Sequence, residues 1–392
     1  MSAALAIGYV PLVDAAPLLV AEALGFAEEE GLTLTLHPAP SWAALRDMLA
    51  SGQVAAAQML SPVPVAMALG LGGSAARFEA LSVLNVNGDA FAVSMTLAAK
   101  MRDAGHEFGF ANALQAGQAL LGASPRGLRI GVPFPFSMHV ELVEYWLNGL
   151  NLPRPAGLEI ISVPPPRMAD ALAAGEIDAF MVGEPWGSVA VEMGVAELLL
   201  PGSAIWAFAP EKVLATRQGW AEAEPDLAGP LLRAVWRAGR WLGLPGNHAS
   251  ASEILAAPGR LDVAPEVIER ALSGRLVISP QGQERRTPGF MEFHAGAASF
   301  PWRSQAGWIA VQMARRFGLD PVAAAKAASA VFRSDLHRLH LAEVGADLPG
   351  ASEKLEGALD HPTPVASARG KLILPRDRFF DARIFDPADP IR

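Results

Sequence analysis

Two neighbouring segments decide the fold: residues 128–150, LRIGVPFPFSMHVELVEYWLNGL, and residues 158–186, LEIISVPPPRMADALAAGEIDAFMVGEPW. Both repeat an earlier part of the chain after a shift of 123 residues. The shift needs no gap and pairs Gly131 with Gly8, Ile130 with Ile7, Asp170 with Asp47, Gly175 with Gly52 and Pro185 with Pro62. Each copy has the pattern strand, helix, strand, helix, strand, so the sequence predicts an α/β fold of two similar lobes.

Lobes of this kind bind small ligands in the crevice at the carboxyl ends of their strands. We predict that residues 1–89 begin lobe 1, that residues 90–205 form an inserted lobe 2, and that residues 206–392 complete lobe 1. Apolar spacing predicts one helix over Ala15–Glu30 and a predominantly helical chain from Lys212 onward. The tail after Leu348 is rich in Pro, Asp and Gly and is predicted to wrap lobe 1 as irregular structure.

Composition excludes several classes of protein. The chain has 392 residues, of which 51% are hydrophobic, so it is long enough for more than one packed core. A formal charge of −9 without a Lys/Arg cluster argues against direct nucleic-acid binding. The absence of cysteine excludes disulfides and thiolate ligands for a metal.

The N-terminal sequence indicates in which cellular compartment the protein is expected. No Lys or Arg precedes Arg46, so the basic segment of a secretory signal is missing. The longest uncharged run, residues 48–76, is interrupted by Pro62, Pro64 and several glycines, which is not typical of a membrane span. From these patterns we expect a cytoplasmic protein without membrane insertion, or a periplasmic one if a leader has been removed.

Five polar or aromatic residues lie where the cleft is expected. His139 begins the helix after a strand, where a helix N-terminus and an imidazole N–H favour an anion, although a His there can simply be a surface or capping residue. Trp42 begins another helix and could line the cleft or pack on the sheet, and Lys212 could meet an anion or remain a solvated charge. Asp89 lies at the first crossing between lobes, and Glu184 ends the last strand of the repeat; both also fit ordinary structural roles.

Motifs for catalysis are weak. The chain lacks the GxSxG and HExxH patterns, and the glycines near residue 70 lack the context of a phosphate loop. His337 and His340 are spaced i,i+3, but their late, polar segment offers no obvious acidic ligands. We therefore predict a binding protein rather than an enzyme, with no cofactor and no metal.

Eight segments resemble the nitrate- and bicarbonate-binding proteins of ABC importers: SWAALRDMLASGQVAAAQMLSPVPVAMALGLG, VNGDAFAVS, PFSMHVELVEYWL, VPPPRMADALAAGEIDAFMVGEPW, PEKVLATRQGW, GAASFPWRSQAGW, VFRSDLHRLHLAE and FFDARIFDPADP. They cover nearly the whole chain. Within this group the chain most resembles the leaderless cytoplasmic branch, the nitrate/nitrite sensors that partner an RNA-binding antiterminator. The resemblance implies a type II periplasmic-binding-protein fold, with two α/β lobes, a ligand cleft and a hinge.

The resemblance also implies that an oxyanion lies against Trp42, His139 and Lys212. This chain departs from the family pattern by having Asp89 where a neutral Asn or Gln is expected, and Val140 where Asn or Asp is expected. An ionised Asp89 would repel nitrate. Asp89 together with Glu184 would instead suit a ligand that is not an anion or that comes with a cation.

The leading hypothesis is a cytoplasmic sensor that binds nitrate or nitrite between its lobes and controls a regulatory partner, the antiterminator being one candidate. One alternative is the solute-binding subunit of an ABC importer, acting with the transporter's other subunits. A second is an enzyme on the same scaffold, with Lys212 or His139 as its base or covalent site. A third is a two-lobed protein for an organic ligand.

Overall fold

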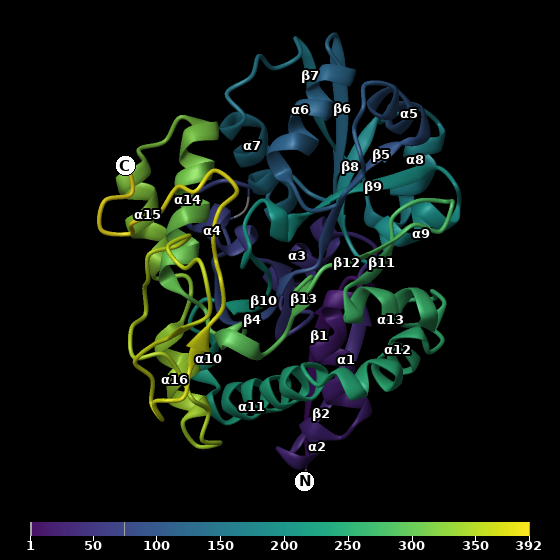
Figure 1. Ribbon diagram of the computed structural model, residues 1–392. Helices are drawn as coiled ribbons and strands as arrows, with labels where there is room; N and C mark the ends of the chain where they lie inside the picture. The colour runs from purple at the N-terminus through teal and green to yellow at the C-terminus, as the bar shows by residue number, and fades with distance from the viewer. Residues whose placement is uncertain (1, 74, 392) are drawn as a thin grey trace.

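The computed structural model describes residues 2–73 and 75–391, which form two α/β lobes facing each other (Figure 1). The first lobe is built on a six-stranded sheet with the order β13-β4-β10-β3-β1-β2. Its strands are β1 (Ala3–Tyr9), β2 (Leu32–Pro38), β3 (Ala56–Leu60), β4 (Phe78–Asn87), β10 (Pro210–Arg217) and β13 (Met291–Glu292). The two-lobed α/β fold predicted from the repeat is therefore confirmed.

The second lobe is built on a five-stranded sheet with the order β7-β6-β8-β5-β9. Its strands are β5 (Asp89–Ser94), β6 (Gly127–Val132), β7 (Gly157–Ser162), β8 (Ala179–Gly183) and β9 (Ala196–Pro201). The chain crosses between the sheets from β4 to β5 and returns from β9 to β10. These crossings agree with an inserted second lobe, while the boundaries at 89/90 and 205/206 stay predictions.

Helices cover the faces of both sheets (Figure 1). Those of the two repeat copies are α1 (Ala16–Ala23), α2 (Phe26–Glu29), α3 (Trp42–Ser51), α4 (Pro62–Ala68), α7 (Met138–Gly149), α8 (Met168–Ala173) and α9 (Trp186–Glu192). Between them lie α5 (Met95–Asp103) and α6 (Ala113–Ala123). The later helices are α10 (Trp220–Ala223), α11 (Pro225–Leu242), α12 (His248–Ala256), α13 (Pro265–Ser273), α14 (Arg303–Phe317), α15 (Pro321–Ser329) and α16 (Ser334–Leu341).

Strand register reproduces the internal repeat. In the first sheet the parallel pair β1–β3 sets Ile7 opposite Ala56 and Gly8 opposite Ala57. In the second sheet β6–β8 sets Ile130 opposite Ala179 and Gly131 opposite Phe180, which is the same pairing moved by 123 residues. Strands β3 and β8 even have the same bounds after the shift, Ala56–Leu60 and Ala179–Gly183. The repeat in the sequence is therefore a repeat of tertiary structure.

Two predictions of secondary structure were wrong. The helix expected over Ala15–Glu30 is divided into α1 and α2, because Gly25 adopts a φ of 73° that ends one helix and starts the next. The chain from Lys212 onward is not helical at its start, since β10 runs to Arg217 as an inner strand of the first sheet, between β4 and β3. The hairpin of β11 (Arg275–Val277) and β12 (Glu284–Arg286) was also missed, because strands of three residues are too short to show alternation.

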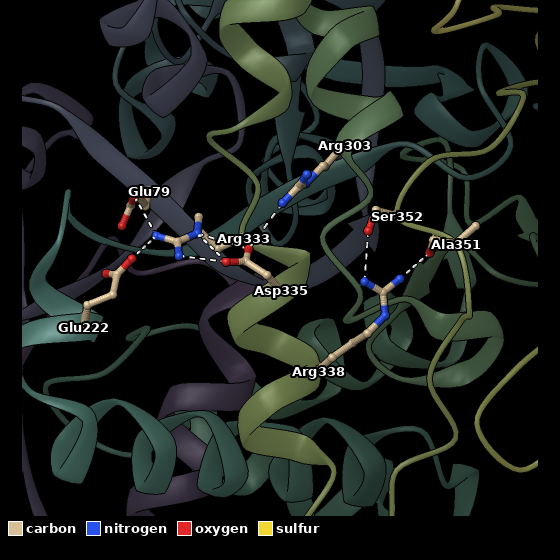
Figure 2. Close-up of polar contacts among 8 residues, drawn as sticks. All are labelled: Glu79, Glu222, Arg303, Arg333, Asp335, Arg338, Ala351 and Ser352. Atoms are coloured by element: carbon tan, nitrogen blue, oxygen red, sulfur yellow. Dashed lines mark hydrogen bonds and ion pairs between the residues drawn. The ribbon is translucent and has the colours of Figure 1, made fainter.

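The C-terminal region is held by arginine side chains (Figure 2). Arg333, just before α16, binds Glu79 of β4 at 2.8 Å, and also binds Glu222 of α10 and Asp335 of α16. Arg338 of α16 donates to the Ser352 hydroxyl at 2.9 Å and to the carbonyl oxygen of Ala351. These contacts fix the start of the tail, which is irregular as predicted apart from β14 (Thr363–Pro364) and β15 (Ile373–Leu374).

The two lobes touch through several polar contacts. Arg316 of α14 forms an ion pair with the buried carboxylate of Glu141 of α7 at 2.5 Å. Burial raises the pKa of Glu141 to about 8, although the Arg316 charge acts in the opposite direction. The Trp186 indole N–H donates to the carbonyl oxygen of Pro11 at 3.2 Å. We call this arrangement, in which the lobes are in direct contact, the closed arrangement.

The lobes also approach each other closely at Gly183, the last residue of β8. A Cβ atom there would lie 3.0 Å from Leu12 Cδ2 and 3.2 Å from Asp14 Oδ2 of the first lobe. The residue at the equivalent repeat position, 123 residues earlier, is Leu60. A side chain in place of Gly183 would therefore crowd Leu12 and Asp14 where the lobes meet.

We predict that Gly183→Ala lowers the free energy of unfolding by about 1–3 kcal/mol, the usual cost of overpacking a buried contact. Gly122→Ala is the matched control, because a Cβ at Gly122 in α6 meets nothing within 4 Å. That control should gain up to about 1 kcal/mol from helix propensity. Urea unfolding followed by circular dichroism measures both, and equal effects of the two variants would contradict the close approach.

A second prediction concerns His337 of α16, which is buried rather than part of a polar surface segment. Its Nδ1 lies 3.0 Å from the carbonyl oxygen of Leu81, and burial lowers its pKa to about 4. Because the unfolded chain takes up this proton near pH 6.5, stability should fall as the pH drops from about 6.5 to about 4. The full loss from this group is about 3 kcal/mol.

His337→Asn keeps an N–H donor but cannot titrate, so its unfolding free energy should depend less steeply on pH in that window. The comparison of variant with wild type is needed because Glu141 and Glu184, whose pKa values are raised to about 8 and about 7, contribute with the opposite sign. Urea unfolding at a series of pH values provides the measurement. The same slope in both proteins would show that His337 is not the titrating group.

Candidate functional site

The two crossings between the sheets form the floor of the cleft, and Asn87 ties them together. At the end of β4, Asn87 donates through Nδ2 to the carbonyl oxygens of Ala207 and Gly289 at 3.0 and 3.1 Å. Its Oδ1 accepts from the backbone N–H of Ala209 at 3.1 Å. The turn-forming residue of the sequence therefore acts as a buried joint that links the outgoing and returning strands.

Lys212 of β10 lies at the centre of the site and is fully buried. Its ammonium group is 2.8 Å from Asp14 Oδ2 and 2.6 Å from Glu211 Oε1. The pairing of β10 with β4 shifts register on both sides of Lys212. Such a bulge breaks the alternation of strand side chains, which allows the neighbouring residues Glu211 and Lys212 to face the same site.

Asp14 reaches the site from the turn before α1. It is buried and is held by the Gln58 side chain, whose Nε2 donates to Asp14 Oδ1. Gln58 of β3 in turn accepts from the backbone N–H of Val10 at 2.9 Å. Asp14 is therefore a positioned counter-ion of Lys212.

His139, in α7, and Asp89, at the start of β5, face this ion pair from the second lobe. His139 Nε2 lies 3.4 Å from Asp89 Oδ1, and His139 Nδ1 lies 3.4 Å from Glu211 Oε1. Neither contact has the geometry of a hydrogen bond, so both ring nitrogens and both Asp89 oxygens are buried without a hydrogen-bond partner. Unpaired buried polar atoms are costly, which makes their convergence here a feature to explain.

Trp42 closes the site as the first residue of α3, following the N-cap Ser41. The Lys212 ammonium lies 5.3 Å from the centre of a Trp42 ring, within range of a cation–π interaction. The indole Nε1 is buried and has no hydrogen-bond partner. Trp42 is thus both a wall of the site and an unused donor.

Glu184 lies apart from this group. Its Oε2 accepts from the backbone N–H of Ser188 at 3.2 Å, so the carboxylate faces α9. Burial raises its pKa to about 7, with Ser188 acting against this shift. The structure therefore brings together Trp42, Asp89, His139 and Lys212, while a ligand contact for Glu184 stays a prediction.

Burial and mutual charge set the protonation states. Burial lowers the pKa of Lys212, but the carboxylates of Asp14, Glu211 and Asp89 outweigh it and hold the pKa above its usual value. Burial, followed by the charge of Glu211, raises the pKa of Asp89 well above its usual range. Burial, with Lys212 nearby, lowers the pKa of His139 well below 6.5. The lysine is therefore charged, the imidazole neutral, and Asp89 is the carboxyl group most readily protonated.

Sequence reasoning missed Asp14 and Glu211. Alternation along a strand would turn Glu211 away from Lys212, and the bulge that changes this has no local sequence signal. Asp14 lies in a single 3-10 turn, Val13–Ala15, between the predicted first strand and the helix predicted to begin at Ala15, where no element was predicted. The sequence shows that Glu211 and Lys212 are adjacent, but it does not show that both side chains are buried.

Three side chains of the site have the spacing of metal ligands: Asp89, His139 and Glu211 each place a ligand atom within 4.8 Å of the others. The Lys212 ammonium, however, already holds Glu211. A divalent cation would have to compete with this buried positive charge. The donor set fits a small molecule held by hydrogen bonds better than a metal ion.

Among the residues that the structure describes, none of the helices is both long enough and apolar enough to cross a membrane.

Comparisons with known proteins bear on the family and the fold of the chain. The chain is 32% identical over 391 residues to the nitrate import ATP-binding protein NrtC of Synechococcus elongatus, covering 98% of this chain and 54% of that protein. The chain thus spans about half the length of this relative. It is 29% identical to the nitrate/nitrite binding protein NrtA of Nostoc, covering 98% and 83% of the two chains.

Among solved structures, the periplasmic nitrate-binding protein NrtA of Synechocystis superposes with a TM-score of 0.83 at 23% identity, over 99% of this chain and 97% of that chain. This match confirms the periplasmic-binding-protein fold. Because the relatives matched over most of their length are binding proteins, the prediction that the chain is not an enzyme is confirmed as well. Residues 1–256 match the model of the NMT1-like family, and the chain belongs to that family.

Proposed function

We propose that the chain binds a small planar oxyanion of the nitrate class between its two sheets. The observation that carries the proposal is the convergence of buried, unpartnered polar atoms on the charged Lys212. They are Trp42 Nε1, the two ring nitrogens of His139, the two carboxyl oxygens of Asp89, and Glu211 Oε2. A ligand that hydrogen-bonds to several of these atoms would satisfy groups that are otherwise left unpaired.

The charge balance requires a neutral Asp89. Lys212 is already paired with Asp14 and Glu211, so an added anion would leave an excess of negative charge if every carboxyl group were ionised. Burial beside Glu211 favours the protonated form of Asp89. A protonated carboxyl group donates a hydrogen bond as a neutral amide does. Glu211 is a neighbouring acceptor for this proton, so Asp89 replaces the expected Asn or Gln when its proton is turned from Glu211 to the ligand.

The names of the relatives support the ligand class. NrtA of Nostoc is a nitrate/nitrite binding protein, and CmpA of Synechococcus elongatus, 25% identical to this chain, is a bicarbonate-binding protein. Nitrate offers acceptors alone, whereas bicarbonate also has a hydroxyl donor for Asp89 or Glu211. We place nitrate and nitrite first because Trp42, His139 and protonated Asp89 supply donors to a ligand that has none.

An anion-binding cleft of this kind fits two alternative roles, a subunit of an importer and a sensor. As the binding subunit of an ABC importer, the chain would deliver the anion to transporter subunits, in keeping with its similarity to NrtC. As a cytoplasmic sensor, closure on the anion would change the surface held by an RNA-binding antiterminator. Cell fractionation with affinity purification separates them: transporter subunits in a periplasmic or membrane fraction support the importer, and an RNA-binding partner in the cytoplasm supports the sensor.

Removal of the Lys212 charge tests the anion site. We expect Lys212→Met to weaken nitrate binding at least about 100-fold, because a buried charge-assisted contact is lost. Trp42→Phe keeps the aromatic wall but removes the unpartnered donor, and should weaken binding about tenfold without loss of fold stability. Isothermal titration calorimetry against nitrate, nitrite and bicarbonate measures each affinity.

Lys326→Met is the matched control for Lys212→Met, since Lys326 is an exposed lysine of α15. Circular dichroism of each variant verifies that it is folded, and Trp42→Phe remains informative if Lys212→Met does not fold. Unchanged nitrate affinity in Trp42→Phe, or no binding of any of the three anions to wild type, would refute the proposed site.

The protonation of Asp89 makes a separate prediction about pH. Because its pKa is raised, wild-type affinity for nitrate should fall as the pH rises through that pKa, by up to about tenfold per pH unit above it. Asp89→Asn should keep the affinity and remove this dependence. Titrations at a series of pH values provide the data. A wild-type affinity that grows with pH would mean an ionised Asp89 and a ligand that donates hydrogen bonds.

A further inference from the structure

A second cavity lies beside the returning crossing from β9 to β10 and has a volume of about 550 Å³. It shares no lining residue with the Lys212 site. Phe110 of the second lobe lines one wall, and Pro201 and Phe208 of the crossing line another. The segment after β12 and the tail near Ile373 complete it. Cavities of this size hold small organic molecules.

The walls of this hinge cavity are apolar. Phe110, Phe208, Pro201, Pro288, Pro375 and Ile373 all line it. Ile373 is 53% exposed and leaves apolar surface uncovered at this wall. Phe110 adopts a φ of 57°, a left-handed conformation that a bulky residue seldom accepts and that is often found at binding sites. Phe110 and Phe208 are themselves almost fully buried, so an aromatic or aliphatic body would mainly cover Ile373, Pro288 and Pro375.

The edge of the cavity is positively charged. Arg286 makes no side-chain hydrogen bond or ion pair with any residue that the structure describes. Arg376 is near enough to Asp360 to lower the pKa of that carboxyl group, but Asp360 is ion-paired with Arg378. Arg285 donates to the carbonyl oxygens of Phe108 and Glu284 and pairs with no carboxylate of the described residues.

The one carboxylate among the lining residues, Glu292, accepts three backbone N–H groups through Oε1. These hydrogen bonds fix Glu292 in the wall, where it offsets one of the three arginine charges. The balance among the described lining residues is therefore positive. It favours a ligand with an anionic head group.

We propose that this hinge cavity is a second ligand site, and that it takes a small organic anion with one acidic head group on an aromatic or branched aliphatic body. The head group pairs with Arg286 and Arg376, and the body fills the space between Phe110 and Phe208. Because the cavity has walls from both lobes and from the crossing between them, its ligand stabilises the closed arrangement of the lobes. This site does not depend on the identity of the ligand in the cleft.

Anilinonaphthalenesulfonate is a suitable probe, because it joins an aromatic body to one anionic group and fluoresces when buried. We expect the intact chain to bind one equivalent. Arg286→Gln combined with Arg376→Gln should weaken binding about tenfold. Ala204→Trp places a large side chain at a residue that lines the cavity and should abolish binding. The uncharged phenylnaphthylamine should be insensitive to the arginine changes and still be excluded by Ala204→Trp.

The matched controls are Arg275→Gln combined with Lys326→Gln, which makes the same change of charge, and Ala104→Trp at an exposed position. Arg275 lies directly opposite Arg286 in the β11–β12 hairpin but does not line the cavity. The controls should bind the dye as wild type does. Absence of dye binding to wild type, or equal binding to wild type and Ala204→Trp, would overturn the proposal.

Discussion

The buried ammonium group of Lys212 is the interaction on which the cleft depends. A charge with no solvent exposure is stable only if opposite charges lie beside it, and Asp14 and Glu211 supply them at 2.8 and 2.6 Å. The close approach at Gly183 and the ion pair between Arg316 and Glu141 keep the lobes together around this group. An anion that enters the cleft must therefore compete with carboxylates that already neutralise the lysine.

The site arises where the two copies of the repeat differ. His139 corresponds to Ala16 and Trp42 to Pro165 after the shift of 123 residues, so each donor has an inert counterpart in the other lobe. Gly183 likewise stands opposite Leu60 in the repeat. The shared backbone places strand ends and helix starts at matching positions, and the side chains at those positions carry the function.

Much of the fold could be predicted because the repeat is encoded in regular strands and helices. The same regularity placed His139 and Trp42 at helix starts facing the cleft. Glu211 could not be predicted, since a register shift in the pairing of β10 decides which way it faces. The short hairpin β11–β12 and the turn holding Asp14 lack a periodic pattern, so their positions depend on tertiary packing.

Asn87 contacts both the floor of the Lys212 cleft and the backbone that lines the hinge cavity. Asn87 lies next to Gly88 and Asp89 of the cleft floor, and its side chain binds backbone groups of Ala207 and Gly289, which line the hinge cavity. A movement of the lobes that alters the crossing must therefore alter both sites. Since each ligand would favour the same closed arrangement, binding at one site should strengthen binding at the other, and thermodynamic linkage makes the effect equal in both directions.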